Sequence, residues 1–263
     1  MRAAEIFEPQ RFRIVDHPQP KPGPGEVLVR VAGVGICGSD LHWFTDEGVG
    51  RNRIRYPAVL GHEPTGEILA TGDGVTGWGP GDRAALEPAI YCYHCEHCHT
   101  GNHNVCANGR FLSSNGEPGY FREFVAIPAS NLLPLPAELS WCVCTLFEPL
   151  AVILNAMDYA MLRPGETAAI YGAGPIGLLT LAMLKLSGVG RVWVVEPARG
   201  RQELALAMGA DAVVDPGAED PVARIRKDTG NRGVDITLDC ATKEDTISQS
   251  IHTTRNAGRV LLL

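Results

Sequence analysis

Four of the eight cysteines fall within one stretch of fifteen residues. They are Cys92, Cys95, Cys98 and Cys106. The two-residue gaps let neighbouring thiolates converge on one cation, and the longer gap lets the loop return with the fourth. Four sulfur ligands complete a tetrahedron and leave no position open for chemistry. We therefore predict a structural zinc site here, in preference to free thiols or two disulfides.

Histidines in the same stretch could compete for the metal. They are His94, His97, His99 and His103. Because four cysteines already fill the coordination shell of zinc, we expect these histidines to be solvated loop residues.

A second set of residues has the chemistry of an open metal site. Cys37 stands in GICGSDLH, His62 and Glu63 stand in LGHEPTG, and Glu148 stands in FEPLAV. Glycines in the first two stretches allow the backbone to bend and aim a ligand into a cleft. One cysteine, one histidine and a carboxylate leave a position for water or substrate, as a catalytic zinc requires. Taken singly, Cys37 and His62 would be ordinary core residues, but together with the four-cysteine loop they predict a second metal site.

The third motif is GAGPIG, with the spacing G-x-G-x-x-G at Gly172, Gly174 and Gly177. It follows the apolar run AAIY and opens an apolar helix, with Pro175 and Ile176 at its start. The glycines allow a tight turn and the close approach of a pyrophosphate to the helix N-terminus. The motif therefore predicts a dinucleotide site.

Glu196 closes the next apolar run, nineteen residues past Gly177. An acid at this place binds both ribose hydroxyls of NAD and repels the 2′-phosphate of NADP. Arg199 and Arg201 follow it and could weaken that preference. We predict NAD as the cofactor, with Arg201 beside it and NADP as the alternative.

The segments around these motifs follow two patterns. Up to residue 146, short β-rich runs such as EVLVRVAGVGI are broken by glycine and proline, which is typical of an antiparallel β domain. From residue 147, helices such as FEPLAVILNAMDYAM and EDTISQSIHTTRNAG alternate with strands such as ETAAIY, RVWVVE and GRVLLL. That alternation predicts a doubly wound parallel sheet. The predicted fold class is α/β, with an antiparallel β domain over 1–146 and a parallel-sheet domain over 147–263.

Composition limits the class of protein. With 45% hydrophobic and 20% charged residues, the 263-residue chain is ordinary for a globular protein with a real core. Its net charge of −7 argues against nucleic acid and against an anionic membrane surface as partners. It has no run of eighteen apolar residues and no apolar leader. We therefore expect a cytoplasmic enzyme that acts on a small molecule.

Together these residues resemble the zinc-containing medium-chain dehydrogenase/reductase (alcohol dehydrogenase) family over the whole chain, and within it the sorbitol and polyol dehydrogenase branch. The likeness rests on GICGSDLHWF, YPAVLGHEPTGEI, GDRAALEP, the cysteine loop, FEPLAV and GAGPIGLLTL. It implies a GroES-like β domain that holds both zinc ions, a Rossmann domain that holds NAD, and an active site between them. It also implies hydride transfer from a secondary alcohol, such as sorbitol or xylitol, to NAD.

The resemblance implies roles for single residues in the open metal site. Cys37 and His62 would bind the catalytic zinc, and Glu63 or Glu148 would complete its shell. Classical alcohol dehydrogenases have a cysteine at the position of Glu148, so the sorbitol branch fits better. Cys142 and Cys144 match no ligand position, and we expect both to be small buried residues.

The resemblance also implies a path for the proton. Ser39 would accept the hydroxyl proton, and His42 would pass it to solvent through the cofactor ribose. Asp40 would orient a zinc ligand. The alternative for Ser39 and Asp40 is local turn bonding after Gly38.

Members of this family usually run further than Leu263, so we expect the chain to be truncated at its C-terminus within an apolar strand. The further segment completes the substrate pocket and the subunit interface in relatives, and we expect the full-length protein to be a homo-oligomer.

Three functional alternatives stay open. A dehydrogenase of L-threonine, or of an aldose such as glucose, would carry every motif above. A non-catalytic relative, quinone-sensing or structural, would keep the fold, but such relatives commonly lose the zinc ligands that this chain retains. The fragment could also be inactive although its parent was an enzyme.

Overall fold

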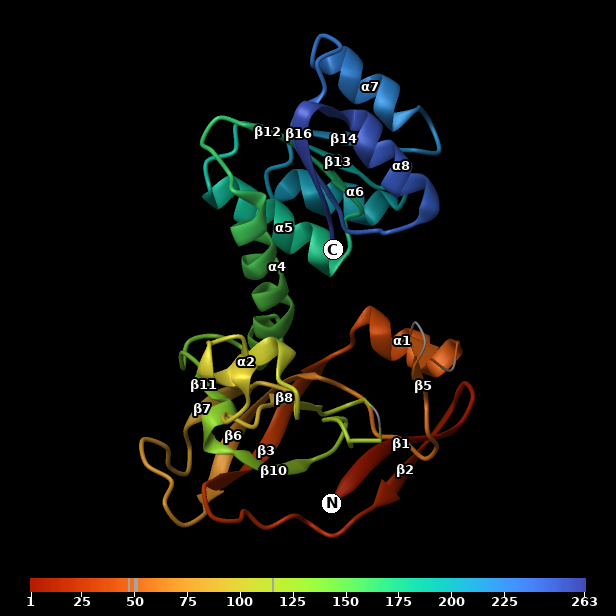
Figure 1. The fold of residues 1–263 in the computed structure, drawn as a ribbon. Helices are drawn as coiled ribbons and strands as arrows, with labels where there is room; N and C mark the ends of the chain where they lie inside the picture. The colour runs from red at the N-terminus through yellow and green to blue at the C-terminus, as the bar shows by residue number, and fades with distance from the viewer. Residues whose placement is uncertain (47, 50–51, 115) are drawn as a thin grey trace. The chain divides into compact units, whose positions relative to one another are not determined.

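The computed structural model describes residues 1–46, 48–49, 52–114 and 116–263. The chain divides into two compact units, Met1–Glu148 and Pro149–Leu263, each with its own sheet and apolar core (Figure 1). The main sheet of the first unit is antiparallel, and the sheet of the second unit is parallel. The predicted fold class is therefore confirmed.

The first unit contains short strands and a few short helices. In chain order these are β1 (Arg2–Glu8), β2 (Arg11–Asp16), β3 (Glu26–Gly35), α1 (Gly38–Thr45), β4 (Gly48–Val49), β5 (Asn52–Arg53), β6 (Glu63–Thr71), β7 (Arg83–Leu86), β8 (Ala89–Ile90), α2 (Glu96–His99), η1 (His103–Val105), β9 (Arg110–Phe111), β10 (Phe124–Pro128), η2 (Ala129–Asn131), β11 (Leu132–Pro134) and α3 (Trp141–Cys144). Five strands form a sheet in the order β10-β3-β6-β7-β11. Side chains of a strand alternate between its faces, and Val27, Val29 and Ile68 are fully buried in the core with Tyr120.

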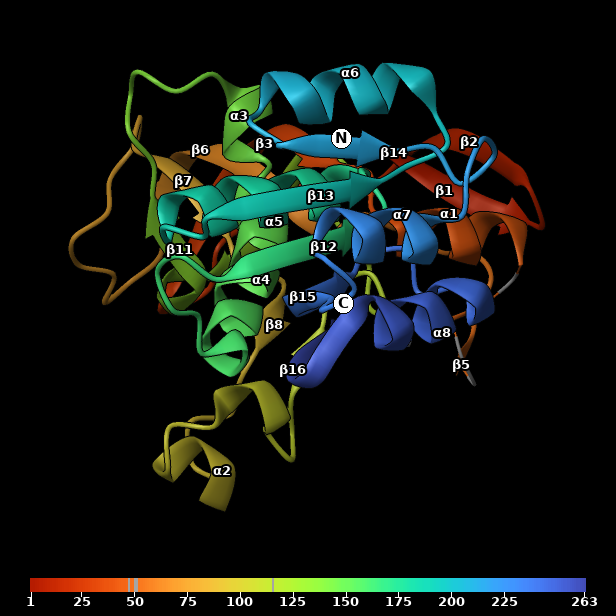
Figure 2. The same ribbon diagram turned by 90° about the horizontal axis from the view of Figure 1, so that it is seen from above.

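The second unit alternates strands with helices. In chain order these are α4 (Phe147–Ala160), which begins at the end of the first unit, β12 (Thr167–Tyr171), α5 (Pro175–Leu186), β13 (Arg191–Val195), α6 (Arg199–Ala207), β14 (Ala212–Val214), α7 (Pro221–Asp228), β15 (Val234–Asp239), α8 (Glu244–Thr253) and β16 (Thr254–Leu262). The parallel strands lie in the order β14-β13-β12-β15-β16 (Figure 2). The direction of winding therefore reverses between β12 and β15, the place where such sheets bind ligands.

Alternate residues of each strand bury the two faces of this sheet. Ile170 of β12 packs in one core with Leu181 and Leu184 of α5. Tyr171, its neighbour, packs in the other core with Ile225 of α7. Because both faces are covered, the strands read as continuous apolar runs in the sequence.

The end of helix α8 differs from the prediction. The helix stops at Thr253, not at the end of EDTISQSIHTTRNAG, and β16 begins at Thr254. The buried hydroxyl of Thr254 donates to the carbonyl of Ser250 at 2.8 Å, and its oxygen lies 2.8 Å from the hydroxyl of Thr237, which can donate to it. These contacts turn the chain into the sheet, so the predicted strand GRVLLL forms only the last part of β16.

Two cysteines near the end of the first unit were predicted to be buried. Cys144 is buried, but Cys142 is exposed, so the prediction for Cys142 is wrong. The short helix α3 explains the difference, because residues two positions apart on a helix point in different directions.

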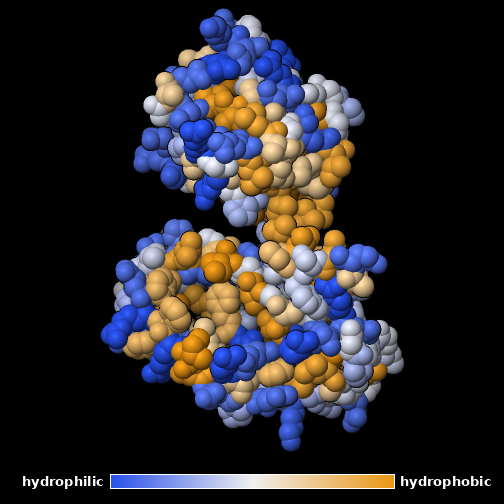
Figure 3. All heavy atoms as spheres, turned by 180° about the vertical axis from the view of Figure 1, so that it is seen from behind, coloured by the Kyte–Doolittle hydropathy of each residue, from blue (hydrophilic) through white to orange (hydrophobic). Residues whose placement is uncertain are grey.

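Apolar side chains also reach the surface. Among the described residues, the helical stretch Trp141–Ala160 has the length and composition of a membrane span. A single such stretch is weak evidence for one, because core helices of soluble proteins pass the same test. Figure 3 shows apolar side chains around a hollow on one face of the first unit. An apolar hollow of this unit is lined by residues that include Ile6, Phe12, Ile36 and Phe121. Exposed apolar hollows are typical of interaction surfaces.

A buried carboxylate, Asp235 of β15, ties several segments of the second unit together. It accepts hydrogen bonds from the backbone N–H and the hydroxyl of Thr167, at 2.9 and 2.8 Å, and pairs with Arg232 and Arg255. Burial opposes its charge, but hydrogen bonds from Arg232, Thr167 and Arg255 lower the pKa of Asp235 well below its usual value. The ionised carboxylate therefore stabilises the folded state.

We predict that Asp235→Asn lowers the free energy of unfolding by about 1–3 kcal/mol at pH 7, the usual cost of leaving buried partners unpaired. Because the folded-state pKa is depressed, the contribution is complete above the unfolded pKa of about 3.9 and is lost as the pH falls towards the folded pKa. Urea unfolding of the parent and of Asp235→Asn at pH 7 and pH 3 should thus show a smaller difference in the free energy of unfolding at pH 3. Asp245→Asn, at an exposed position of α8, is the matched control. A difference that stays constant between the two pH values would contradict the prediction.

Candidate metal centres and cofactor site

The candidate metal site of Cys37, His62 and Glu63, called the mixed-ligand site below, begins between β3 and α1. The helix α1 was not predicted from the sequence. Cys37 is the N-cap residue of α1, in an extended conformation. The carboxylate of Asp40, in the first turn, accepts a hydrogen bond from the backbone N–H of Cys37 at 3.0 Å. An acid in the first turn also stabilises the positive end of a helix. The cap therefore fixes the backbone that carries the thiol.

His62 and Glu63 enter the site from the neighbouring strand. Glu63 is the first residue of β6 and pairs in register with Gly35 of β3. A Cβ atom at Gly35 would lie 1.9 Å from Oε2 of Glu63, so only glycine leaves room for this carboxylate. Gly61 has a φ of 92°, a left-handed conformation that favours glycine. Its N–H donates to the carboxylate of Asp40 at 3.2 Å.

The structure brings three of the predicted ligands together. The ligand atoms of Cys37, His62 and Glu63 all lie within 4.8 Å of one another. The buried carboxylate of Asp40 lies 3.5 Å from Nδ1 of His62, which leaves Nε2 for a metal. The ring of Phe111, a residue that the sequence reading did not single out, lies 5.7 Å from the His62 ring, centre to centre.

The electrostatics of this cluster suit a cation. A hydrogen bond with His62 lowers the pKa of Cys37, although burial opposes it. Burial disfavours the charge of His62, but hydrogen bonds with Asp40 and Cys37 raise its pKa to about 10. Burial raises the pKa of Glu63 and of Glu148, and Glu148 lies close enough to respond to the charges of His62 and Glu63. A thiolate, an imidazole and two desolvated carboxylates form a donor set that fits zinc.

The two residues of the predicted proton path lie on the same helix but in different surroundings. Ser39 forms hydrogen bonds with Cys37 through its hydroxyl and its backbone, and they lower the pKa of Cys37. His42 is exposed, and its Nδ1 atom lies 2.7 Å from the carboxylate of Asp46. The structure thus places Ser39 at the cluster and His42 on the solvent side of α1.

The four-cysteine loop folds into a compact cluster of sulfurs. Its Sγ atoms are 3.5 Å apart for Cys92 and Cys106, 3.9 Å for Cys95 and Cys106, and 4.0 Å for Cys92 and Cys98. Zn–S bonds of roughly 2.3 Å in a tetrahedron would require sulfurs roughly 3.8 Å apart. The loop therefore already has the dimensions of a four-sulfur zinc site.

The base of this loop is held by ordinary protein contacts. Strands β8 and β9 pair on either side of it. The buried amide of Asn131 donates to the carbonyls of Glu87 and Ala89 at 2.9 and 2.8 Å. The loop thus leaves and rejoins the unit at a fixed position.

The thiols of the loop differ in acidity. The backbone N–H of His94 lowers the pKa of Cys92 to about 5, whereas loss of hydration raises that of Cys98 to about 12. A cation would draw all four thiols into the thiolate form. Among the described residues, no histidine joins the sulfur cluster: Nδ1 of His94 lies 2.6 Å from the carbonyl of Cys92, and the ring of His103 packs on tyrosines.

The glycine motif forms a tight turn between β12 and α5. Gly172 has a φ of 94°, and Gly174 is the N-cap residue of α5. A Cβ atom at Gly177 would lie 1.9 Å from the carbonyl oxygen of Gly172, so the helix can approach the strand only with glycine there. Pro175 and Ile176 begin the helix, as predicted. The backbone N–H groups of this first turn are a suitable site for a pyrophosphate.

Glu196 lies directly after β13 and is 3% exposed. One carboxylate oxygen accepts from the N–H of Ala173 at 2.7 Å, and the other accepts from the N–H of Ala198 at 2.9 Å. Each oxygen keeps a lone pair that could accept from a ribose hydroxyl. Of the two arginines that follow, Arg199 pairs with Glu203, and Arg201 pairs with no carboxylate in the part of the chain that the structure describes.

Comparisons with known proteins match segments in both units of the chain. Residues 23–137 match the family model of the alcohol dehydrogenase GroES-like domain, and residues 175–263 match that of zinc-binding dehydrogenases. The chain is 34% identical to sorbitol dehydrogenase of Bacillus subtilis, over 100% of this chain and 74% of that protein. It is 38% identical to L-threonine 3-dehydrogenase of Pyrococcus horikoshii, over 95% of this chain and 71% of that protein.

A solved structure of another dehydrogenase is also similar over the whole chain. The crystal structure of 2R,3R-butanediol dehydrogenase from Bacillus subtilis is similar with a TM-score of 0.87 and 35% identity, over 100% of this chain and 76% of that one. The matched region thus spans the segments of this chain that carry both metal clusters and the glycine turn.

We predict that the protein binds two zinc ions that differ in lability. The cluster of Cys37, His62 and Glu63 has an open position, whereas the four-sulfur cluster is closed. A mild chelator should therefore remove the metal of the open site first and leave the fold intact, as followed by metal analysis and circular dichroism. Cys95→Ser should reverse the order of release. Loss of both metals in a single step together with unfolding would count against two independent sites.

Proposed function

The chain belongs to the zinc-binding alcohol dehydrogenase family, and we propose that it transfers a hydride from a secondary alcohol, a polyol such as sorbitol or xylitol, to NAD. The cluster of Cys37, His62 and Glu63 carries this proposal. One thiol, one imidazole and a carboxylate leave a coordination position for a substrate hydroxyl, whereas four thiols do not. The similarity to a sorbitol dehydrogenase and a butanediol dehydrogenase supports a substrate with more than one hydroxyl.

In this proposal, Cys37 and His62 hold the catalytic zinc, with Glu63 or Glu148 as the third protein ligand. Zinc in such a site supplies a Lewis acid that lowers the pKa of the substrate hydroxyl. Asp40 holds the His62 ring and the backbone of Cys37 in place, as its contacts indicate. The four-cysteine loop holds the structural zinc.

Two residues of α1 move the proton in this proposal. Ser39 Oγ, beside Cys37, accepts the proton of the substrate hydroxyl. His42, exposed and paired with Asp46, passes the proton on towards solvent. A proton acceptor close to the metal and a histidine at the surface have the order that such a relay requires.

The proposed cofactor site uses the second unit. Gly172, Gly174 and Gly177, with Pro175 and Ile176, bind the pyrophosphate of NAD, and Glu196 binds its ribose. Arg201 lies on the following helix, α6, where its charge is available to the cofactor. The buried, doubly hydrogen-bonded carboxylate of Glu196 supports a preference for NAD, because burial makes the repulsion of a 2′-phosphate stronger.

L-threonine is the second candidate substrate. The identity of 38% to a threonine dehydrogenase favours it, and the ligands in this chain suit either alcohol. The two proposals differ in the group beside the reacting hydroxyl, which is a further hydroxyl in a polyol and a charged amine and carboxylate in threonine.

We predict that Glu196→Gln raises the ratio of kcat/KM for NADP to that for NAD by at least about tenfold. Glutamine keeps an oxygen acceptor and removes the negative charge, so the 2′-phosphate is no longer repelled. Steady-state kinetics with both cofactors measures the ratio, and Glu203→Gln on the surface of α6 is the control. If the unchanged protein already uses NADP better than NAD, the preference assigned to Glu196 is wrong.

The proposed reaction is tested with the zinc-loaded protein. We expect NADH to form with sorbitol or xylitol, and more slowly or not at all with L-threonine and glucose. Cys37→Ser should lower kcat by more than about a hundredfold, beyond the cost of losing a group that only orients a ligand. Cys142→Ser, at an exposed cysteine, should leave kcat unchanged. If none of these alcohols reduces NAD or NADP while both metals are bound, the proposed function is wrong.

A further inference from the structure

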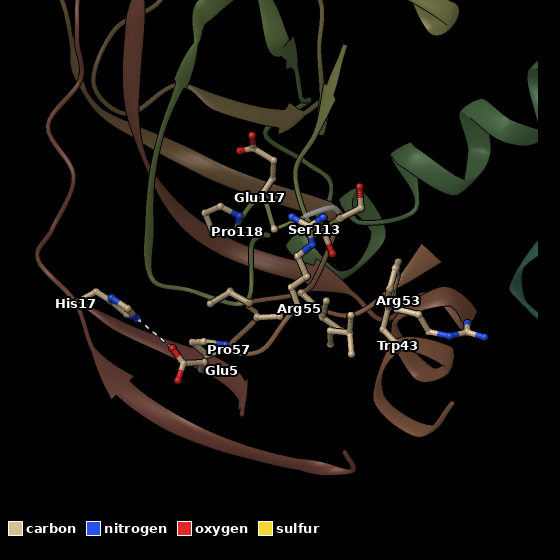
Figure 4. A pocket seen from close by; sticks show the side chains of 15 residues that line it. Glu5, His17, Trp43, Arg53, Arg55, Pro57, Ser113, Glu117 and Pro118 are labelled. Atoms are coloured by element: carbon tan, nitrogen blue, oxygen red, sulfur yellow. Dashed lines mark ion pairs between the residues drawn. The ribbon is translucent and has the colours of Figure 1, made fainter. Parts of the chain in front are cut away.

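A cavity of about 280 Å³ in the first unit is lined by none of the residues assigned to the proposed reaction (Figure 4). Among the described residues, it is lined by Glu5 of β1, His17 after β2, Trp43 of α1, Arg53–Arg55, Pro57–Leu60, Ser113, Ser114 and Gly116–Pro118. Trp43, Ile54 and Leu60 form an apolar wall. The polar residues of its lining limit what the cavity could bind.

Ser113 lines this cavity, and its hydroxyl is buried. The residue is 3% exposed, and its Oγ atom has no hydrogen-bond partner among the described residues. Its backbone has a φ of 86°, which an L residue adopts only when its surroundings hold it there. Buried hydroxyls are nearly always hydrogen-bonded, so an unpaired one that lines a cavity indicates a missing partner.

Arg55, an exposed residue, also lines the cavity and brings a positive charge to its mouth. Over the described ranges its guanidinium forms no ion pair, although it lines the cavity. The lining carboxylates already have cationic partners: Glu5 lies 2.6 Å from Arg13, and Glu117 lies 2.8 Å from Arg110. In Figure 4, Arg55 and Ser113 are drawn in the middle of the lining residues, with Glu5 and His17 to one side. The charge without a counter-ion in this lining is therefore positive.

We propose that this cavity binds the oxyanion group of a small molecule, a phosphate or a carboxylate, between the guanidinium of Arg55 and the hydroxyl of Ser113. An oxyanion accepts several hydrogen bonds at once and matches the planar donors of arginine. It would satisfy both the unpaired charge and the unpaired hydroxyl. A neutral polyol would satisfy only the hydroxyl.

Several residues that line the cavity are close in sequence to residues of the mixed-ligand cluster. Trp43 follows Asp40 on α1, and Leu60 precedes Gly61 and His62. Ser113 comes two residues after Phe111, whose ring contacts His62. The oxyanion has two possible sources, which are the far end of the oxidised alcohol and a free anion that binds beside it. The first source rests on the proposed function, but oxyanion binding itself does not.

Titration with inorganic phosphate tests the site directly in the zinc-loaded protein, by calorimetry at low ionic strength. We expect Arg55→Gln to weaken phosphate binding at least about tenfold, as the loss of a charged hydrogen-bonding partner does. Ser113→Ala should weaken it several-fold. Arg11→Gln removes the same charge from an exposed pair outside the cavity and should bind as the parent does. Absence of phosphate binding, or binding that both cavity variants retain in full, would overturn the proposal.

Thermal unfolding separates binding from folding in these variants. Ser113→Ala removes a buried hydroxyl without a partner, so the variant should be at least as stable as the parent. A ligand role then predicts weaker binding in a protein of undiminished stability. If Ser113→Ala unfolds at a clearly lower temperature and binds phosphate normally, the hydroxyl has a structural role and the proposal fails.

Kinetics with sorbitol and sorbitol 6-phosphate distinguish the two sources of the anion. If the anion is part of the substrate, kcat/KM is at least about tenfold higher for the phosphate ester, and Arg55→Gln reduces this preference whereas Arg11→Gln keeps it. If the anion is free, the two alcohols are used equally and phosphate binding still depends on Arg55. If no alcohol is oxidised, the proposed function fails, while the phosphate titration still decides on the site.

Discussion

The buried carboxylate of Asp40 is the contact on which the geometry of the mixed-ligand site depends. It accepts from the backbone N–H groups of Cys37 and Gly61, and it faces the ring of His62. These contacts connect the start of α1 to the start of β6, two segments that come from neighbouring strands of the main sheet. A carboxylate is suited to this position because its two oxygens accept several hydrogen bonds. A small shift of Asp40 would therefore move both the thiol and the imidazole.

The two metal clusters stand in different relations to the fold. The mixed cluster lies on β3, β6 and α1, whose backbone is fixed by sheet pairing and by the cap of α1. The four-cysteine loop has little structure beyond the turns of α2 and η1, and its thiols differ in acidity. Such a loop would be ordered mainly by the bound ion, whereas the residues of the mixed-ligand site are already held in place by the protein. This difference is the physical reason to expect one labile and one structural ion in this unit.

The proposed cofactor site depends on the close approach of backbone segments. Gly177 and Gly172 allow α5 to meet the turn after β12, and Glu196 then reaches the same turn through the N–H of Ala173. The acid from β13 and the helix N-terminus thus belong to one hydrogen-bonded unit. The oxyanion proposed for the first unit would meet different chemistry, because Arg55 offers a charged fork in place of a helix end.

The sequence alone was sufficient to predict the residues of the two candidate metal clusters, the glycine turn, the parallel sheet and the antiparallel β domain. These features are local, since a run of a few residues determines whether thiols can converge or whether a turn can form. Tertiary structure decided the rest. Asp40 meets Gly61 from a distant position in the chain, Glu148 responds to the charge of His62, and a buried hydroxyl of Thr254 ends α8 early. The unpaired Ser113 and Arg55 share a cavity for the same reason: burial and charge balance depend on segments that only the folded chain brings together.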